Sequence, residues 1–199
     1  MASGPTAPLA NSNILLIRHA EKPDTGPGLS PAGRARADAY VGFFRGLALD
    51  GPGGLDHLFA AEDSPASARP SLTVAPLAAA LGLAVVTNFK DKDYKSLAGH
   101  LLGLDQFANS GIVICWHHEH ILPLAASLGV DANHLPASSA WPNRWPGDVF
   151  GWLLRIGYDD QGRVIPGRTV CLNERLTDDD RLDPPSGDPS GFPRNPSTA

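Results

Sequence analysis

Two short apolar runs, each ending at a histidine, constrain this chain more than any other feature of its sequence. Residues 14–17 are four consecutive branched aliphatic residues, and Arg18 and His19 follow them directly. Residues 112–116 form a second apolar run, which ends at His117 and a His-Glu-His triplet. Apolar runs without polar alternation are typical of strands that are buried on both faces, as in the middle of a parallel sheet. The sequence therefore predicts an α/β fold with two central strands that end in histidine.

The side chains that follow the first run are suited to chemistry on an anion. In an open α/β sheet, ligands bind outside the carboxyl ends of the strands, where Arg18 and His19 would stand. Arginine offers a fixed fork of donors that fits phosphate or carboxylate, and histidine offers a nucleophile or a proton-transfer group near neutral pH. A single Arg-His pair could simply be the polar end of a buried strand. The second strand ending in histidine makes the functional interpretation the stronger one.

The overall charge argues against a general attraction to nucleic acid or to an acidic membrane. The 199 residues include 16 Lys and Arg against 21 Asp and Glu, which gives a formal net charge of -5. Any anion site must then be a local cluster of cations. The length suffices for one domain with a sizeable core, and no internal repeat or central linker argues for two.

Neither the cysteines nor the N-terminal residues indicate a secreted or membrane protein. Only Cys115 and Cys171 occur, and both are expected to be buried thiols. No apolar run approaches the roughly 20 residues of a membrane helix, and residues 1–12 lack the basic and apolar regions of a signal peptide. We expect residues 1–12 to be a flexible leader and the protein to be cytoplasmic. The sequence leaves open whether a native targeting segment was removed, and it does not indicate the oligomeric state.

Between the two histidine-ending strands, the sequence predicts alternating helices and strands. Ser30 and Pro31 suit the N-cap and the first position of a helix that runs to about residue 49. Arg69 lies just ahead of a second helix, where the backbone amides and the helix dipole favour an anion. The second helix is expected to end at residue 80. The sequence also predicts strands at 55–60, 83–87 and 111–116 and helices at 96–104 and 121–128.

The C-terminal part is expected to close one edge of the sheet. Residues 148–158 and 163–172 predict two strands around a turn signal, and these strands would pair as a hairpin. Trp141, Trp145 and Trp152 are expected to be core or interface residues. Residues 13–176 then form the single domain. Residues 177–199, rich in Asp, Pro, Ser and Gly, form an irregular tail.

Four motifs in this order resemble those of the histidine phosphatase superfamily, the clan that also holds cofactor-dependent phosphoglycerate mutases. They are Arg18-His19, the segment 29–37, Ser64-Pro65 ahead of Arg69 with Thr73 four residues later, and the late strand that ends in histidine. The resemblance spans residues 13–125 and points to small phosphatase-like members. It implies a three-layer α/β/α sandwich with a mainly parallel central sheet, helices on both faces and a phosphoglycerate mutase-like fold.

Two positions depart from the pattern of these members. The spacing from Ser64-Pro65 to Arg69 is one residue longer than usual, which argues against a phosphate-binding role for Ser64. Gly151, in the predicted terminal strand, stands where such members commonly carry Asp.

The resemblance implies a phosphatase that hydrolyses a phosphate monoester through a phosphohistidine intermediate on His19. Arg18, Arg69 and a late histidine would surround the phosphoryl oxygens and neutralise their charge. No metal or other cofactor is then required, because phosphoryl transfer depends mostly on positioning and charge stabilisation. Glu21, two residues after the nucleophile, is also predicted to lie at the phosphate.

The choice of the late histidine differs between branches of the family. The general pattern has a hydrophobic residue four positions after the histidine, and Ile121 stands in that relation to His117. Members with Trp, one residue and then His instead select His118. We prefer His118 and retain His117 as the alternative.

The sequence offers several candidates for the general acid. If His118 is the late histidine, Glu119 follows it directly, as in the branch where a His-Asp pair supplies the proton donor. Glu21 is the second candidate. Asp91 or Asp93 is the third, since mutase-like members carry their acid after the third strand.

Three alternatives remain open at this point. The stretch 117–120 could bind zinc, since histidine and carboxylate are zinc ligands, but its spacing is not His-Glu-x-x-His and no further ligand is evident. The protein could be a catalytically impaired phosphate-binding module, or a mutase-type phosphotransferase, although no inserted segment to shield a phosphohistidine is evident. The predicted partner is a phosphorylated small-molecule or phosphoprotein substrate, with no nucleic acid and no membrane.

Overall fold

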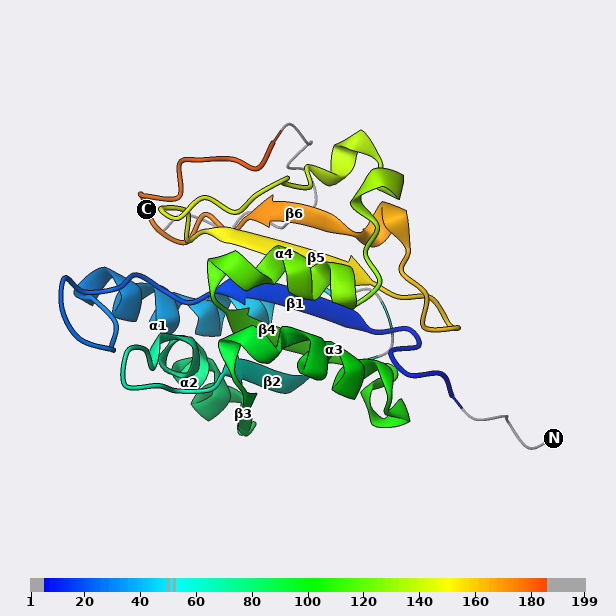
Figure 1. Ribbon diagram of the computed structural model, residues 1–199, viewed down its shortest axis with the longest axis horizontal. Coiled ribbons are helices and arrows are strands. Elements are labelled where there is room, and N and C mark those ends of the chain that lie inside the picture. The colour runs from blue at the N-terminus through cyan, green and yellow to red at the C-terminus, as the bar shows by residue number, and fades with distance from the viewer. Residues whose placement is uncertain (1–5, 50, 52, 186–199) are drawn as a thin grey trace.

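One six-stranded sheet forms the centre of the structure (Figure 1). The computed structural model describes residues 6–49, 51 and 53–185. Its strands are β1 (Asn13–Arg18), β2 (Leu55–Ala61), β3 (Val85–Phe89), β4 (Gly111–Trp116), β5 (Trp152–Gly157) and β6 (Val170–Asn173). They lie in the order β3-β2-β4-β1-β5-β6. The first four strands pair in parallel, whereas β5 pairs antiparallel with both β1 and β6.

Helices cover both faces of this sheet (Figure 1). The α-helices are α1 (Pro31–Gly46), α2 (Arg69–Leu81), α3 (Tyr94–Leu102) and α4 (His118–Ser127). Buried residues of α1 and α2 pack with Leu15 and Ile17, and those of α3 and α4 pack with Ile14 and Leu16. Successive residues of a strand point to opposite faces, so β1 contributes to both halves of the core. The predicted three-layer α/β/α sandwich with a mainly parallel sheet is confirmed. Short 3-10 helices are η1 (Asp91–Asp93), η2 (Asp105–Phe107), η3 (Ala132–His134), η4 (Ala137–Ser139) and η5 (Pro166–Arg168).

Several predicted elements are present with shifted ends. The predicted helix from Pro31 ends at Gly46 rather than at residue 49, and strand β3 begins at Val85 rather than at residue 83. Helix α3 covers Tyr94–Leu102 rather than 96–104. Helix α4 begins at His118, three residues before the predicted start, with Glu119 in its first turn where the helix dipole favours negative charge. Only the last shift affects the site, because it places His118 inside a helix.

Strands β5 and β6 form the predicted antiparallel hairpin at the sheet edge, although both are shorter than expected. The turn that follows β5 is fixed by the side chain of Asp159, which accepts two backbone N–H bonds, and by Gly162, whose φ of 71° is left-handed. Trp145 and Trp152 are buried and Trp141 packs against the same core, as predicted.

Parts of both predicted ends pack onto the domain. Leu9 and Ala10 are buried, so the predicted flexible leader is wrong for residues 9–10, while residues 1–5 lie outside the described residues. Leu9 packs in the core. The sequence did not indicate this, because only a short, isolated apolar stretch surrounds it. Residues 177–185 contain no helix or strand, but the carboxylate of Asp180 accepts a hydrogen bond from the buried Arg36. Residues 186–199 of the predicted tail lie outside the described residues.

Two further observations bear on location and chemistry. No described helix is both long enough and apolar enough to span a membrane. Cys115 and Cys171 are buried free thiols, as the sequence indicated, and burial raises the pKa of both.

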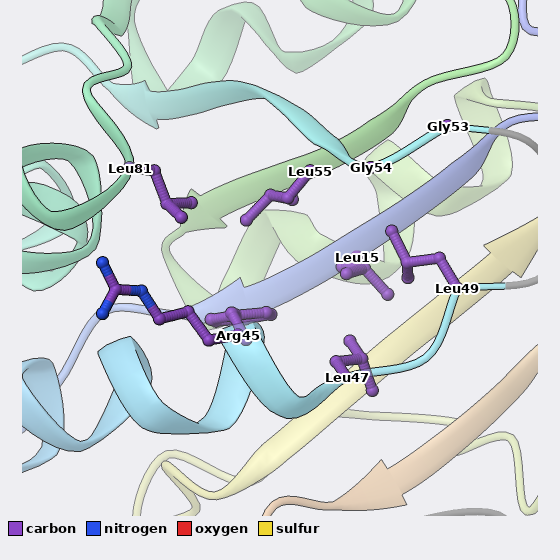
Figure 2. Close-up of a pocket in the computed structure, with 9 residues that line it drawn as sticks. Leu15, Arg45, Leu47, Leu49, Gly53, Gly54, Leu55 and Leu81 are labelled. Carbon is purple, nitrogen blue, oxygen red and sulfur yellow. The ribbon is translucent and has the colours of Figure 1, made fainter.

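An apolar cavity of about 290 Å³ lies near the beginning of β2, at the end of the sheet away from Arg18 (Figure 2). It is lined mostly by leucines from β1, β2 and the ends of α1 and α2. With Arg45 as its one charged lining side chain among the described residues, it offers little for chemistry on an anion.

The start of α1 is fixed against the loop that follows β1. The side chain of Ser30 accepts a hydrogen bond from the backbone N–H of Gly33 (3.0 Å), and the N–H of Ser30 donates to the carbonyl of Glu21 (2.9 Å). A Cβ added at Gly33 would lie 2.4 Å from that same carbonyl oxygen. Glycine at position 33 therefore allows α1 to approach the loop that carries the predicted nucleophile.

We expect Gly33→Ala to lower the free energy of unfolding by about 1–3 kcal/mol, because the added methyl group must displace backbone. Gly42→Ala is the matched control: it lies in the same helix, is exposed, and its added Cβ would meet nothing within 4 Å. This control should raise the free energy of unfolding by about 0.5–1 kcal/mol. Chemical denaturation of both variants measures the difference, and equal values would contradict the close approach.

Candidate active site

His19 lies directly after β1 and is 3% exposed. Its backbone N–H donates to the carbonyl of Trp116 (3.0 Å), the last residue of β4, so the ends of the two strands are tied together. The ring of His117 lies edge-on to the ring of His19, with 4.9 Å between centroids. The two histidines that the sequence placed after two strands therefore meet at one point.

The imidazole of His19 is held in one tautomer. Its Nδ1 lies 2.8 Å from the carbonyl oxygen of Ala20, which can only accept, so Nδ1 carries the proton. Burial, with smaller contributions from His117, Arg18 and Arg69, lowers the pKa of His19 to about 3. The ring is therefore neutral near pH 7, with the lone pair on Nε2 free to attack.

Arg18 is a buried cation held by the loop before β5. Its Nη1 donates to the carbonyl of Val149 (2.8 Å), and its guanidinium carbon lies 3.8 Å from the ring centroid of Phe150. Burial lowers the pKa of Arg18 to about 10, so the group stays charged near neutral pH. Its Nε–H is buried and has no hydrogen-bond partner among the described residues. An anion at this position would meet an unused donor.

Arg69, the first residue of α2, is the second cation near His19. Its Nε–H is also buried without a partner in the described part of the chain. Thr73 links this helix to the nucleophile loop, since its hydroxyl accepts from the N–H of Ala20 (2.8 Å) and donates to the carbonyl of Arg69 (2.7 Å). This bridge gives a physical reason for the spacing of four residues between Arg69 and Thr73.

Ser64 takes part in a local turn. Its N–H donates to the carbonyl of Ser67, and its hydroxyl accepts from the N–H of Ser67. The extra residue between Ser64-Pro65 and Arg69 is accommodated by this turn, and Ser64 itself is exposed. The geometry agrees with the expectation that Ser64 contributes no phosphate donor.

The structure brings His117, rather than the preferred His118, against His19. His117 is the N-cap residue of α4 and keeps an extended backbone, which directs it back toward the end of β1. His118 is the first helical residue, and the helix turns it toward Gly147, whose added Cβ would lie 3.6 Å from His118 Nε2. The preference for His118 was based on the Trp-x-His pattern of some family members, whereas the position of each histidine depends on which residue takes the N-cap of α4.

Neither preferred carboxylate forms a hydrogen bond with the His19 ring in the described part of the chain. Glu119 is exposed on α4, beside His118. Glu21 is paired with Arg36, whose Nε and Nη2 both donate to Glu21 Oε1, at 2.9 and 2.8 Å. Glu21 is therefore engaged in a charge-assisted contact with Arg36.

Asp91, the third-ranked candidate, is the carboxylate that faces the late histidines. Its Oδ2 lies 2.9 Å from Nδ1 of His120, and its backbone carbonyl accepts from Nε1 of Trp116 (3.0 Å). Burial lowers the pKa of His117, and the charge of Asp91 opposes that shift more than any other group. Oδ1 of Asp91 is buried and has no hydrogen-bond partner among the described residues. Asp93 is exposed on the same 3-10 turn.

A groove of about 390 Å³ opens beside His118. Burial lowers the pKa of His118, and the charge of Arg18 lowers it further, so the groove is within electrostatic reach of the cation. Residues of α4 and of the loop before β5 line it: His118, Glu119, Leu122, Pro123, Asn143, Arg144 and Trp145.

Two residues near the site, Arg36 and Phe150, were missed from the sequence. Arg36 is fully buried and is surrounded by Glu21, Glu174 and Asp180. Phe150, under Arg18, was also missed. The one available signal was Gly151: family members commonly carry Asp at this position, so the sequence lacked a carboxylate there.

In the described residues no group of three or more His, Cys, Asp or Glu side chains is arranged to hold a metal ion, so the zinc hypothesis gains no geometric support.

No protein-family model and no curated protein matches this sequence, but solved structures share its architecture. This shared architecture is the phosphoglycerate mutase-like fold that the sequence resemblance predicted. One similar structure is an Escherichia coli K-12 protein assigned as an alpha-ribazole-5'-P phosphatase, with a TM-score of 0.54 and 16% identity over 81% of this chain and 96% of that chain. Another is the protein histidine phosphatase SixA complexed with tungstate, with a TM-score of 0.50 and 12% identity over 81% of this chain and 97% of that chain.

The low pKa of His19 predicts a specific dependence of stability on pH. Its folded pKa of about 3 lies below its ordinary value of 6.5, so the unfolded chain binds the proton first as pH falls. The stabilising contribution is complete above pH 6.5 and is lost between 6.5 and 3, by about 1.4 kcal/mol per pH unit. As the pH falls, we expect the free energy of unfolding of wild type to decrease relative to that of His19→Asn, whose side-chain amide can still donate to Ala20.

Denaturation of both proteins at pH 7, 6, 5 and 4 measures the effect. The difference in free energy of unfolding between the two removes the contributions of all other titrating groups. A difference that stays constant over this range would mean that His19 titrates normally.

Proposed function

We propose that this protein is a phosphatase that hydrolyses a phosphate monoester through a phosphohistidine on His19. The observation that carries the proposal is the neutral imidazole of His19, with Nδ1 bonded to Ala20 and Nε2 unprotonated, between two guanidinium groups that each keep a buried N–H unpaired. The shared fold supports the class of enzyme. Both similar structures described above carry names of phosphatases.

In the first step, Nε2 of His19 attacks phosphorus and the ester P–O bond breaks. The leaving alkoxide takes a proton and departs as the alcohol. Arg18, Arg69 and His117 bind the equatorial oxygens, and their donors are worth most where water is excluded. In the second step water attacks the phosphohistidine, the P–N bond breaks, and inorganic phosphate leaves with His19 neutral again. Charge is supplied by side chains, so the proposal includes no metal.

Asp91 is our proposal for the proton donor and for the base that activates water. Glu21 is occupied by Arg36, and Glu119 is exposed on the groove side. The unpartnered Oδ1 of Asp91 and the electrostatic contact of its carboxylate with His117 support this choice.

We propose that the groove beside His118 receives the part of the substrate that follows the phosphate. Its lining combines an arginine, a carboxylate and a tryptophan with apolar side chains, which suits a phosphorylated small molecule or a short segment of a phosphoprotein.

One observation favours a second candidate, a phosphate-binding module without turnover. Among the described residues, no carboxylate is hydrogen-bonded to His19 or to His117. Phosphate affinity without phosphohistidine formation would identify this case.

The first experiment is hydrolysis of p-nitrophenyl phosphate by wild type and His19→Asn, with a chelator present, and detection of an acid-labile, base-stable phosphoenzyme. We expect turnover and phosphoenzyme in wild type and a loss of about 10³-fold or more in the variant, because the nucleophile is absent. Release of inorganic phosphate without isomer exchange separates a phosphatase from a mutase. Turnover that persists in His19→Asn would overturn the mechanism.

The role of Asp91 predicts a dependence on the leaving group. Asp91→Asn should lower kcat/KM for an alkyl phosphate by about 10²-fold or more, because the alkoxide needs a proton, but lower kcat/KM for p-nitrophenyl phosphate much less. Asp93→Asn, exposed on the same 3-10 turn, is the matched control and should leave both values within about twofold. An equal loss of kcat/KM on both substrates in Asp91→Asn would assign Asp91 a structural role, and a leaving-group effect in Asp93→Asn would reassign the acid.

A further inference from the structure

Arg36 is the centre of a buried cluster of charges on the α1 side of the site. Its side chain is 1% exposed. Asp180 Oδ1 and Oδ2 accept from its two terminal nitrogens at 2.6 and 3.0 Å, and Glu21 and Glu174 accept from it as well. We refer to Arg36, Glu21, Glu174 and Asp180 as the Arg36 cluster. Three carboxyl groups surround one guanidinium. Burial raises the pKa of Glu174 to about 8, which reduces the negative charge around Arg36 near neutral pH.

Asp180 reaches this cluster from the irregular segment after β6. The backbone amides of Leu176 and Thr177 donate to its carboxylate (2.9 and 3.1 Å), and its own carbonyl accepts from Asn173. A Cβ added at Gly151 would lie 2.3 Å from the carboxyl carbon of Asp180. The carboxylate thus occupies the space that a side chain at position 151 would fill.

Glu21 connects the Arg36 cluster to the nucleophile. It lies two residues after His19, and the residue between them, Ala20, binds the imidazole through its carbonyl and Thr73 through its N–H. Glu21 is also the carboxylate that most opposes the burial-driven fall in the pKa of Arg18, so the two side chains are within electrostatic reach. Without Arg36, Glu21 would be free to pair with Arg18 and to compete with phosphate.

We propose that Asp180 is a positioning residue of the active site: it fixes Arg36, and Arg36 holds Glu21 away from Arg18 while it fixes the turn that presents His19. The proposal assigns a function to the C-terminal segment. It also implies that a carboxylate at position 151 can replace the carboxylate of Asp180. Its kinetic part rests on the proposed phosphatase activity. Its structural part does not.

The experiment uses four variants of the full chain. Asp180→Ala removes the carboxylate, and Gly151→Ala displaces it, since the new Cβ would lie 2.2 Å from Asp180 Oδ1. The double variant Gly151→Ala/Asp180→Ala removes the overlap and still lacks a carboxylate. The double variant Gly151→Asp/Asp180→Ala returns a carboxylate to the same space from the residue just before β5. The two double variants differ only in that carboxylate, so their comparison separates positioning from packing.

Three quantities are measured on each variant at a temperature where its melting curve shows it folded. These are kcat/KM on p-nitrophenyl phosphate, the affinity for inorganic phosphate, and the 15N resonance of the Nδ1–H group of His19. We expect the three variants without a seated carboxylate to lose about tenfold or more in kcat/KM and in phosphate affinity, with a shifted His19 resonance. We expect Gly151→Asp/Asp180→Ala to recover all three toward wild type.

Two results would overturn the proposal. One is a folded Asp180→Ala protein that keeps kcat/KM, phosphate affinity and the His19 resonance of wild type. The other is a Gly151→Asp/Asp180→Ala protein no better than Gly151→Ala/Asp180→Ala. A wild type without turnover would contradict the proposed function, and phosphate affinity and the His19 resonance would still decide whether Asp180 positions the site.

Discussion

The register between β1 and β4 is the constraint on which the site depends. Arg18 is paired with Trp116 across the two parallel strands, and the N–H of His19 continues the ladder to the carbonyl of Trp116. Because parallel strands in this register end at the same level, the residues after each strand must meet. A shift of one residue would also turn Ile14 and Leu16 to the opposite face of the sheet, so the packing of both core halves opposes it. The position of the imidazole pair is thus fixed by the core rather than by the loops.

Around this fixed point, the protein places cations in a chain of net negative charge. Burying Arg18 costs solvation, which is visible in its lowered pKa, and the carbonyl of Val149 and the ring of Phe150 offset part of that cost. The same desolvation keeps His19 neutral and therefore nucleophilic. One physical cause, exclusion of water at the end of β1, thus accounts for the lowered pKa of both Arg18 and His19.

The parts of this arrangement that follow local rules could be predicted from the sequence. The apolar runs before His19 and His117 indicated β1 and β4 almost to the residue, and Ser30 with Pro31 located the start of α1. The choice between His117 and His118 could not be made, because it depends on which residue takes the N-cap of α4. Arg36 was equally out of reach, since its partner Asp180 lies 144 positions away and only tertiary packing joins them.

Gly151 shows how such a long-range pairing can still leave a trace in the sequence. A glycine in a buried stretch costs conformational entropy, so its presence needs a reason. Here the reason is the carboxylate of Asp180, which fills the space beside it and binds Arg36. Asp180 itself stands in a segment rich in Asp, Pro, Ser and Gly, a composition that by itself indicates irregular structure. Arg36 binds both Asp180 and Glu21. The segment whose composition indicates irregular structure is therefore joined, through one buried guanidinium, to the turn that carries His19.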